Sequence, residues 1–145
     1  MANSFESLEV WKESRIFRKE VSILVKSFPF EEKYKLTDQI IRSSRSITAN
    51  IAEGHGRYHF QENTQFCRQA RGSLTETLDH LICAMDENYI SEIQLNEFRI
   101  QYEKCIRLLN GYIGFLQKQK ELQKPNNQQQ ITNNQLTNNQ LQINQ

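Results

Sequence analysis

The sequence predicts an all-α fold: an antiparallel up-down-up-down four-helix bundle, followed by a disordered C-terminal tail. The 145 residues include only five glycines and two prolines, too few for a turn-rich β fold. Four segments place apolar residues three and four positions apart, which is the period of one helix face. The connections between these segments are short, and short connections favour antiparallel neighbours. We therefore expect a bundle domain over residues 1–124 and the tail over residues 125–145.

The first expected helix covers residues 7–28. Val10, Phe17 and Val21 lie on one face of it, and Ser7 is a suitable N-cap. Pro29 ends this helix, because a residue that precedes proline disfavours the helical conformation.

The second expected helix begins at Leu36 and forms the centre of the bundle. Its apolar stripe contains Ile40, Ile47 and Ile51, and small residues flank the stripe. Small flanks let neighbouring helices approach closely on several sides. Gly54 is expected to end the helix in a left-handed C-cap, which leaves residues 54–60 as a loop.

The third and fourth expected helices cover residues 61–88 and 91–124. The third carries two adjacent stripes of apolar and small residues. Ser91 is placed to cap the fourth, and Pro125 ends it. The spacing of three and four runs without a break from Leu95 to Leu116, which makes the fourth helix the most regular of the set.

The tail differs in composition from the helices. Residues 126–145 contain no charged side chain and repeat asparagine- and glutamine-rich units. Such a composition favours a disordered segment with some tendency to β-aggregation over a functional prion-like element.

Charge is unevenly distributed along the chain, although the net charge is only +1. Residues 33–71 carry seven basic and three acidic side chains, residues 104–124 carry five and one, and residues 72–103 carry one and seven. Folding into a bundle brings the two positive segments to one end. The nucleic-acid-binding residues expected at this end are Arg57, Arg68, Arg71, Lys118, Lys120 and Lys124. The opposite end collects acidic residues, among them Glu31, Glu92 and Asp86.

Some apolar residues lie outside the predicted core faces. These residues predict a self-association interface, which would consist of Ile16, Ile23, Ile106, Leu108, Ile113 and Phe115. Aligned pairs on two helices favour an oligomer over scattered surface leucines.

The sequence predicts no catalytic, metal or cofactor site. His55 and His59 are four residues apart, but the nearby glycines favour exposed loop histidines over a metal pair. Ser43, Ser46 and Ser73 lack a base at a matching spacing, so close helix packing explains them better than nucleophilic catalysis. We expect no small-molecule substrate, and an enzyme that uses a pocket in the bundle core is one alternative.

Cysteine usage and hydropathy favour a cytoplasmic protein. The three cysteines are far apart and form no paired motif. The N-terminal residues form no apolar signal core, and no apolar run is long enough for a membrane helix.

Several motifs resemble one known family over residues 5–120. They are Phe5-x-x-Leu8-x-Val10-Trp11, Phe28-Pro29, Tyr34-x-Leu36-x-x-Gln39-Ile40, Ser46-Ile47-x-x-Asn50-Ile51-Ala52-Glu53-Gly54 and Ala70-x-Gly72-Ser73-x-x-Glu76. The sequence thus resembles the four-helix-bundle proteins encoded in intervening sequences of bacterial 23S ribosomal RNA genes. Relatives include the accessory protein of diversity-generating retroelements, a pentamer that contacts a reverse transcriptase and RNA. The resemblance implies a bundle, a pentamer, an RNA-linked role and no enzyme activity. A protein-interaction scaffold without nucleic-acid contact is the alternative hypothesis for the function.

Overall fold

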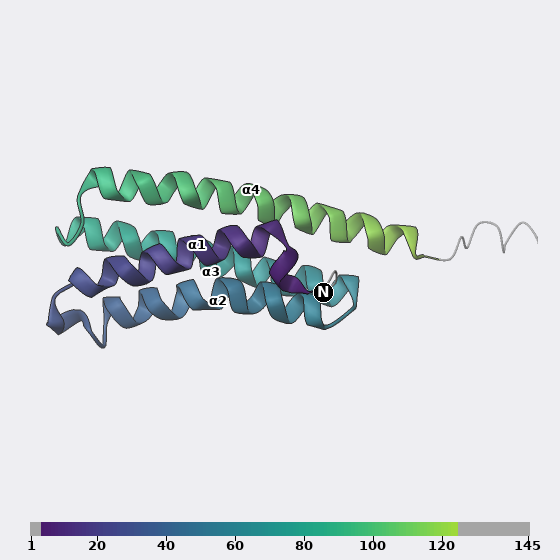
Figure 1. Ribbon diagram of the computed structural model, residues 1–145, viewed down its shortest axis with the longest axis horizontal. Coiled ribbons are helices and arrows are strands. Elements are labelled where there is room, and N and C mark those ends of the chain that lie inside the picture. The colour runs from purple at the N-terminus through teal and green to yellow at the C-terminus, as the bar shows by residue number, and fades with distance from the viewer. Residues whose placement is uncertain (1–3, 125–145) are drawn as a thin grey trace, which may run out of the picture.

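A computed structural model describes residues 4–124 of the chain, and its four long helices confirm the predicted all-α fold (Figure 1). The helices are α1 (Glu9–Leu24), α2 (Leu36–Gly56), α3 (Phe60–Asp86) and α4 (Glu92–Leu122). Short 3₁₀ turns lie at Phe5–Ser7, Val25–Ser27 and Phe30–Glu32. The predicted tail over residues 125–145 lies outside the described residues.

Consecutive helices run in opposite directions and pack side by side (Figure 1). α4 also packs against α1, which closes the four helices around one core. Each helix contributes fully buried side chains to this core, such as Phe17, Ile47, Leu74 and Leu109, all 0 % exposed. The helical spacing of these residues predicted their positions in the core.

The end of α2 corrects the predicted C-cap. α2 continues past Gly54 to Gly56, and no glycine among residues 4–124 has a positive φ. Gly54 is instead buried where α2 meets α3. A Cβ atom at this position would lie 2.7 Å from the Asn63 side-chain oxygen and 2.8 Å from Phe66 Cβ. The glycine therefore permits close helix packing, and Tyr58, with a φ of 52°, makes the turn.

The helix starts were predicted with mixed success. Ser91 caps α4 through a capping box, in which its hydroxyl accepts from the Gln94 amide and the Gln94 side chain accepts from the Ser91 amide. The proposed Ser7 cap was wrong, because α1 begins at Glu9 and Leu8 occupies its N-cap. Ser4 instead caps the preceding 3₁₀ turn by accepting from the Glu6 amide.

A seam of hydroxyl groups joins α2 to α3, with one pair buried and the other half-buried. The Thr77 hydroxyl donates to Ser43 Oγ over 2.8 Å, and the Ser73 hydroxyl donates to Ser46 Oγ over 2.9 Å. The Ser43 hydroxyl in turn donates to the Ile40 carbonyl. The four residues, Ser43, Ser46, Ser73 and Thr77, are named the hydroxyl seam below. Their bonds fit the structural interpretation of these serines.

Candidate nucleic-acid interface

The α2–α3 turn, the start of α3 and the end of α4 lie at one end of the bundle (Figure 1). Five of the six basic residues predicted for nucleic-acid binding come from these three segments, while Arg71 lies near the middle of α3, beside Asn110 of α4. We call this region the basic end and define it by these six residues.

Two of the six basic residues already have partners within the chain. The Arg57 guanidinium lies 3.0 Å from a Glu53 carboxylate oxygen and 5.2 Å from the centre of the Phe66 ring. The Arg71 guanidinium donates to the Asn110 side-chain oxygen over 2.8 Å. These contacts occupy part of the donor capacity that a phosphate would need.

Arg68 of α3 and Lys120 of α4 line one hollow of about 130 Å³. Its other lining residues are uncharged and polar: Gln61, Thr64, Gln65 and Gln117. Within residues 4–124, no carboxylate oxygen lies within 4.0 Å of either cationic group. Two uncompensated cations among amide donors suit an anionic group such as phosphate.

Lys120 also lines a neighbouring hollow of about 230 Å³ with Tyr58 and His59. The Tyr58 side chain is 86 % exposed, so its ring is accessible for stacking. His59 is the N-cap of α3, where its ring nitrogen accepts from the Glu62 amide. Lys118 and Lys124 are exposed but line neither hollow. The structure thus brings Arg68 and Lys120 together and leaves these two lysines apart.

At the opposite end of the bundle, two hydrogen bonds hold the Glu32 carboxylate in place. Glu32 accepts from the Leu36 amide and from the Tyr89 hydroxyl, each over 3.0 Å. The Leu36 amide, more than the Tyr89 hydroxyl, lowers the pKa of Glu32, and the same hydroxyl bond raises the pKa of Tyr89. Glu32 therefore remains negative and links the α1–α2 connection to the α3–α4 connection.

The residues predicted for self-association divide between surface and core. Ile16, Ile23 and Phe115 are 47 %, 64 % and 54 % exposed, and Leu108 is half-buried. Ile113 is only 5 % exposed, so its assignment to an interface was wrong: the neighbouring helices already cover it. Ile106 is likewise half-buried and packs against the core.

Sequence reasoning missed two exposed residues on α4. Ile93 and Ile100 are more than 70 % exposed and, being seven residues apart, share one side of the helix. A hydrogen bond between Gln101 and Glu20 shows that α1 lies beside this region of α4. The apolar residues that the two helices bring to this surface, Ile16, Ile23, Ile93, Ile100, Leu108 and Phe115, are named the α1–α4 face; all of them are exposed except the half-buried Leu108.

Two of the three thiols are buried in the core, and Cys83 is exposed. Burial raises the pKa of the Cys67 thiol to about 12 and that of Cys105 to about 11, so neither is a ready nucleophile. The His80 ring lies 3.3 Å from the Glu76 carboxylate. Within residues 4–124, no three histidine, cysteine or acidic side chains gather where they could hold a metal ion. No helix in the same range has an apolar stretch that could span a membrane.

Both the fold and the sequence of this chain are similar to those of known proteins. None of the curated proteins matches the chain significantly. The fold is similar to the crystal structure of a protein of unknown function from the S23 ribosomal protein family of Bacteroides thetaiotaomicron VPI-5482. The TM-score is 0.67 at 25 % identity, and the match covers 72 % of this chain and 95 % of the other. A model of the 23S rRNA-intervening sequence protein family matches residues 6–111, so the chain belongs to this family.

Proposed function

We propose that the protein is a non-enzymatic, self-associating bundle of the cytoplasm that binds structured RNA at its basic end. The observation that carries the proposal is the hollow between α3 and α4, where Arg68 and Lys120 lack a carboxylate partner within residues 4–124. Electrostatic binding of a phosphate backbone requires such uncompensated cations. The exposed Tyr58 ring beside Lys120 supplies a stacking surface for an unpaired base.

Self-association would increase the effect of a small basic site. The α1–α4 face contains large apolar side chains that are exposed to solvent in the single chain. Their burial against another copy of the chain would be favourable. The family resemblance implies a pentamer. In a ring of parallel subunits, the basic ends would lie on one rim, and a net charge of +1 per chain would conceal this concentration.

The RNA proposal is tested with a fluorescent hairpin RNA and the double variant Arg68→Gln with Lys120→Gln. Affinity should fall, and the slope of log K against log salt should decrease by about 1.8, because each phosphate contact contributes about 0.9 on duplex. Arg99→Gln with Arg107→Gln removes the same charge elsewhere on α4 and is the matched control. Unchanged affinity and slope in the basic-end variant would contradict the proposal, as would a wild type that binds no RNA at low salt.

Self-association is tested with Ile23→Glu and Ile100→Glu, which place charges on the α1–α4 face. The mass measured by light scattering should fall while helicity is retained. Phe30→Glu is the control, because Phe30 is 82 % exposed and lies in the α1–α2 connection, outside this face. A wild type that is monomeric at micromolar concentration would refute the interface.

A protein-interaction scaffold without RNA contact is the second candidate. The α1–α4 face favours it, since the same apolar side chains could bind another protein, including a reverse-transcriptase-like enzyme that the bundle would assist. Retained partner binding by a wild type with no RNA affinity at any salt concentration would select this candidate.

A further inference from the structure

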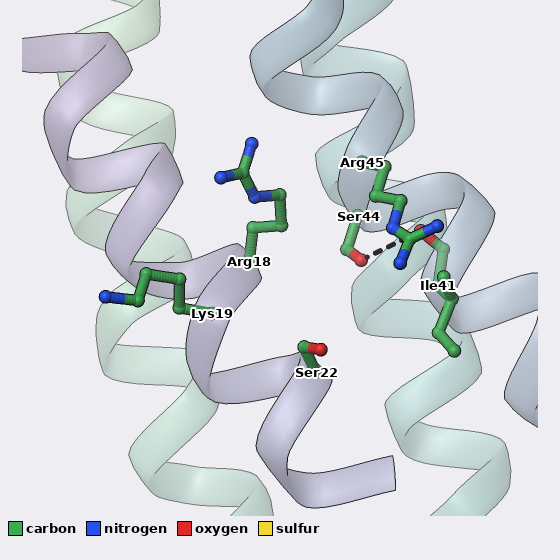
Figure 2. Close-up of a pocket in the computed structure, with 6 residues that line it drawn as sticks. All are labelled: Arg18, Lys19, Ser22, Ile41, Ser44 and Arg45. Carbon is green, nitrogen blue, oxygen red and sulfur yellow. Dashed lines mark hydrogen bonds between the residues drawn. The ribbon is translucent and has the colours of Figure 1, made fainter.

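A second concentration of positive charge lies between α1 and α2, away from the basic end. A hollow of about 360 Å³ is lined there by Arg18, Lys19 and Ser22 of α1 and by Ile41, Ser44 and Arg45 of α2. Figure 2 shows that Arg18 and Ser22 face Ser44 and Arg45 across the space between the two helices. The Lys19 side chain extends along the outer side of α1.

The hollow continues toward the connection between α1 and α2. A second hollow, of about 440 Å³, shares Ser22 and Ile41 with the first. Its lining adds Lys26 of the 3₁₀ turn after α1, and Lys33 and Tyr34 of the connection. We call the two hollows together the α1–α2 groove. From Arg18 to Lys26 the groove is about 12 Å long, taking about 1.5 Å per residue.

The positive charges of the α1–α2 groove are not compensated within residues 4–124. None of its five cations, Arg18, Lys19, Lys26, Lys33 and Arg45, lies within 4.0 Å of a carboxylate oxygen. The one carboxylate among the lining residues belongs to Asp38, which pairs with Arg42 over 3.0 Å. Cations that face each other across a shared hollow repel, so a bound anion would stabilise the arrangement.

The chain holds one of these cations in position. Arg18 Nη1 donates to the Thr48 hydroxyl over 2.6 Å, and Thr48 is 2 % exposed. A guanidinium has five N–H donors, so this bond orients the group and leaves most of its donors for a ligand. Planar donor pairs of this kind match the geometry of phosphate.

An aromatic ring completes the far end of the groove. Tyr34 is 81 % exposed, and the Lys33 ammonium lies 5.3 Å from the centre of its ring. A basic groove with an accessible aromatic side chain is the combination that binds single strands, whose bases are free to stack. A duplex keeps its base faces covered and would gain nothing from this ring.

We propose that the α1–α2 groove binds the sugar–phosphate backbone of single-stranded nucleic acid. Arg18 and Arg45 hold the phosphates, and Tyr34 stacks on a base. The site lies on other helices than the basic end, so this inference is tested separately from the proposed function.

The test measures binding of a fluorescein-labelled uridine 12-mer by anisotropy at several salt concentrations. Arg18→Gln with Arg45→Gln should weaken binding about tenfold or more at low salt. The salt slope should decrease by about 1.4, because each phosphate contact contributes about 0.7 on a single strand. Tyr34→Leu should weaken binding at least about fivefold without changing the slope.

The control is Arg99→Gln with Arg107→Gln, which removes the same charge from α4 and should bind as the wild type does. Arg45→Gln alone is a second test, because Arg45 is exposed and its loss leaves the core intact. The inference is overturned if the groove variants keep wild-type affinity and slope, if the control loses as much, or if Arg18→Gln with Arg45→Gln weakens the binding of a duplex of equal length as much as that of the single strand. It also fails if only Arg68→Gln with Lys120→Gln weakens binding, a result that would leave the proposed function standing.

Discussion

Gly54→Ala tests whether close packing, and not a turn, requires glycine in α2. Within a helix, this change alone would stabilise the fold by about 1 kcal/mol, because alanine is the better helix former. The new methyl group would, however, lie 2.7 Å from the Asn63 side-chain oxygen and 2.8 Å from Phe66 Cβ. The Phe66 Cβ is fixed to the α3 backbone, so a side-chain rotation cannot relieve that contact.

The net effect follows from these opposing contributions. Overpacking of a core by one methyl group costs about 1–3 kcal/mol. Displacement of Asn63 also disturbs its bonds to the Tyr112 hydroxyl and from the Cys67 thiol, for about 1 kcal/mol. After the gain in helix propensity, Gly54→Ala should lower the free energy of unfolding by about 2 kcal/mol, or Tm by roughly 5–10 °C.

Thermal unfolding followed by circular dichroism at one fixed protein concentration measures this difference. Gly111→Ala is the matched control, since a Cβ at Gly111 of α4 meets nothing within 4 Å. It should raise stability by up to about 1 kcal/mol. If Gly54→Ala were as stable as Gly111→Ala, the close approach of α2 and α3 at Gly54 would not be what requires glycine there.

Three further predictions concern burial and charge. Ile47→Asp should leave a chain that does not unfold cooperatively. A carboxylate at this fully buried position costs several kcal/mol, against a total free energy of unfolding of about 5–15 kcal/mol. A cooperative thermal transition in this variant would contradict the prediction. The pKa of Glu32 is held below its ordinary 4.5. The contribution of the Glu32 carboxylate to the free energy of unfolding is therefore complete above about pH 4.5 and is lost as the pH falls through the lowered pKa. The wild type should therefore lose more stability than Glu32→Gln between about pH 5 and about pH 3, and parallel losses would refute the linkage. Ellman's reagent should react with Cys83 alone in the native protein, because Cys67 and Cys105 are buried, and with all three thiols in denaturant. Fast labelling of more than one thiol in the native protein would contradict the packing.

The helices and their core faces could be predicted because burial imposes a period on the sequence. Phe17, Ile47 and Leu109 fall on such stripes, and all three are fully buried. The role of Gly54 could not be predicted, since a glycine near a helix end serves equally as a C-cap or as a point of close approach. Only the position of Phe66 on α3 distinguishes the two.

The surface was less predictable than the core. Ile113 lies at the edge of a wide apolar stripe, and the sequence does not reveal how far the neighbouring helices wrap around that edge. The division of the chain into charged segments found the basic end. The same division missed the α1–α2 groove, because Arg18 and Arg45 belong to different segments and meet only across two helices. A charge count for each helix face would have come closer to finding it.

The hydroxyl seam also determines the alignment of α2 with α3. Apolar ridges alone permit two helices to slide by one turn, about 5.4 Å, with similar burial. Such a shift would separate Thr77 from Ser43 and Ser73 from Ser46, and each of these two hydrogen bonds between the helices contributes about 0.5–1.5 kcal/mol. The seam thus favours one alignment of α2 with α3 over the shifted ones, as a single buried polar residue does in a coiled coil. An apolar replacement of the seam would be expected to fold into several registers of similar energy, and the hollows between the helices would lose their fixed shape.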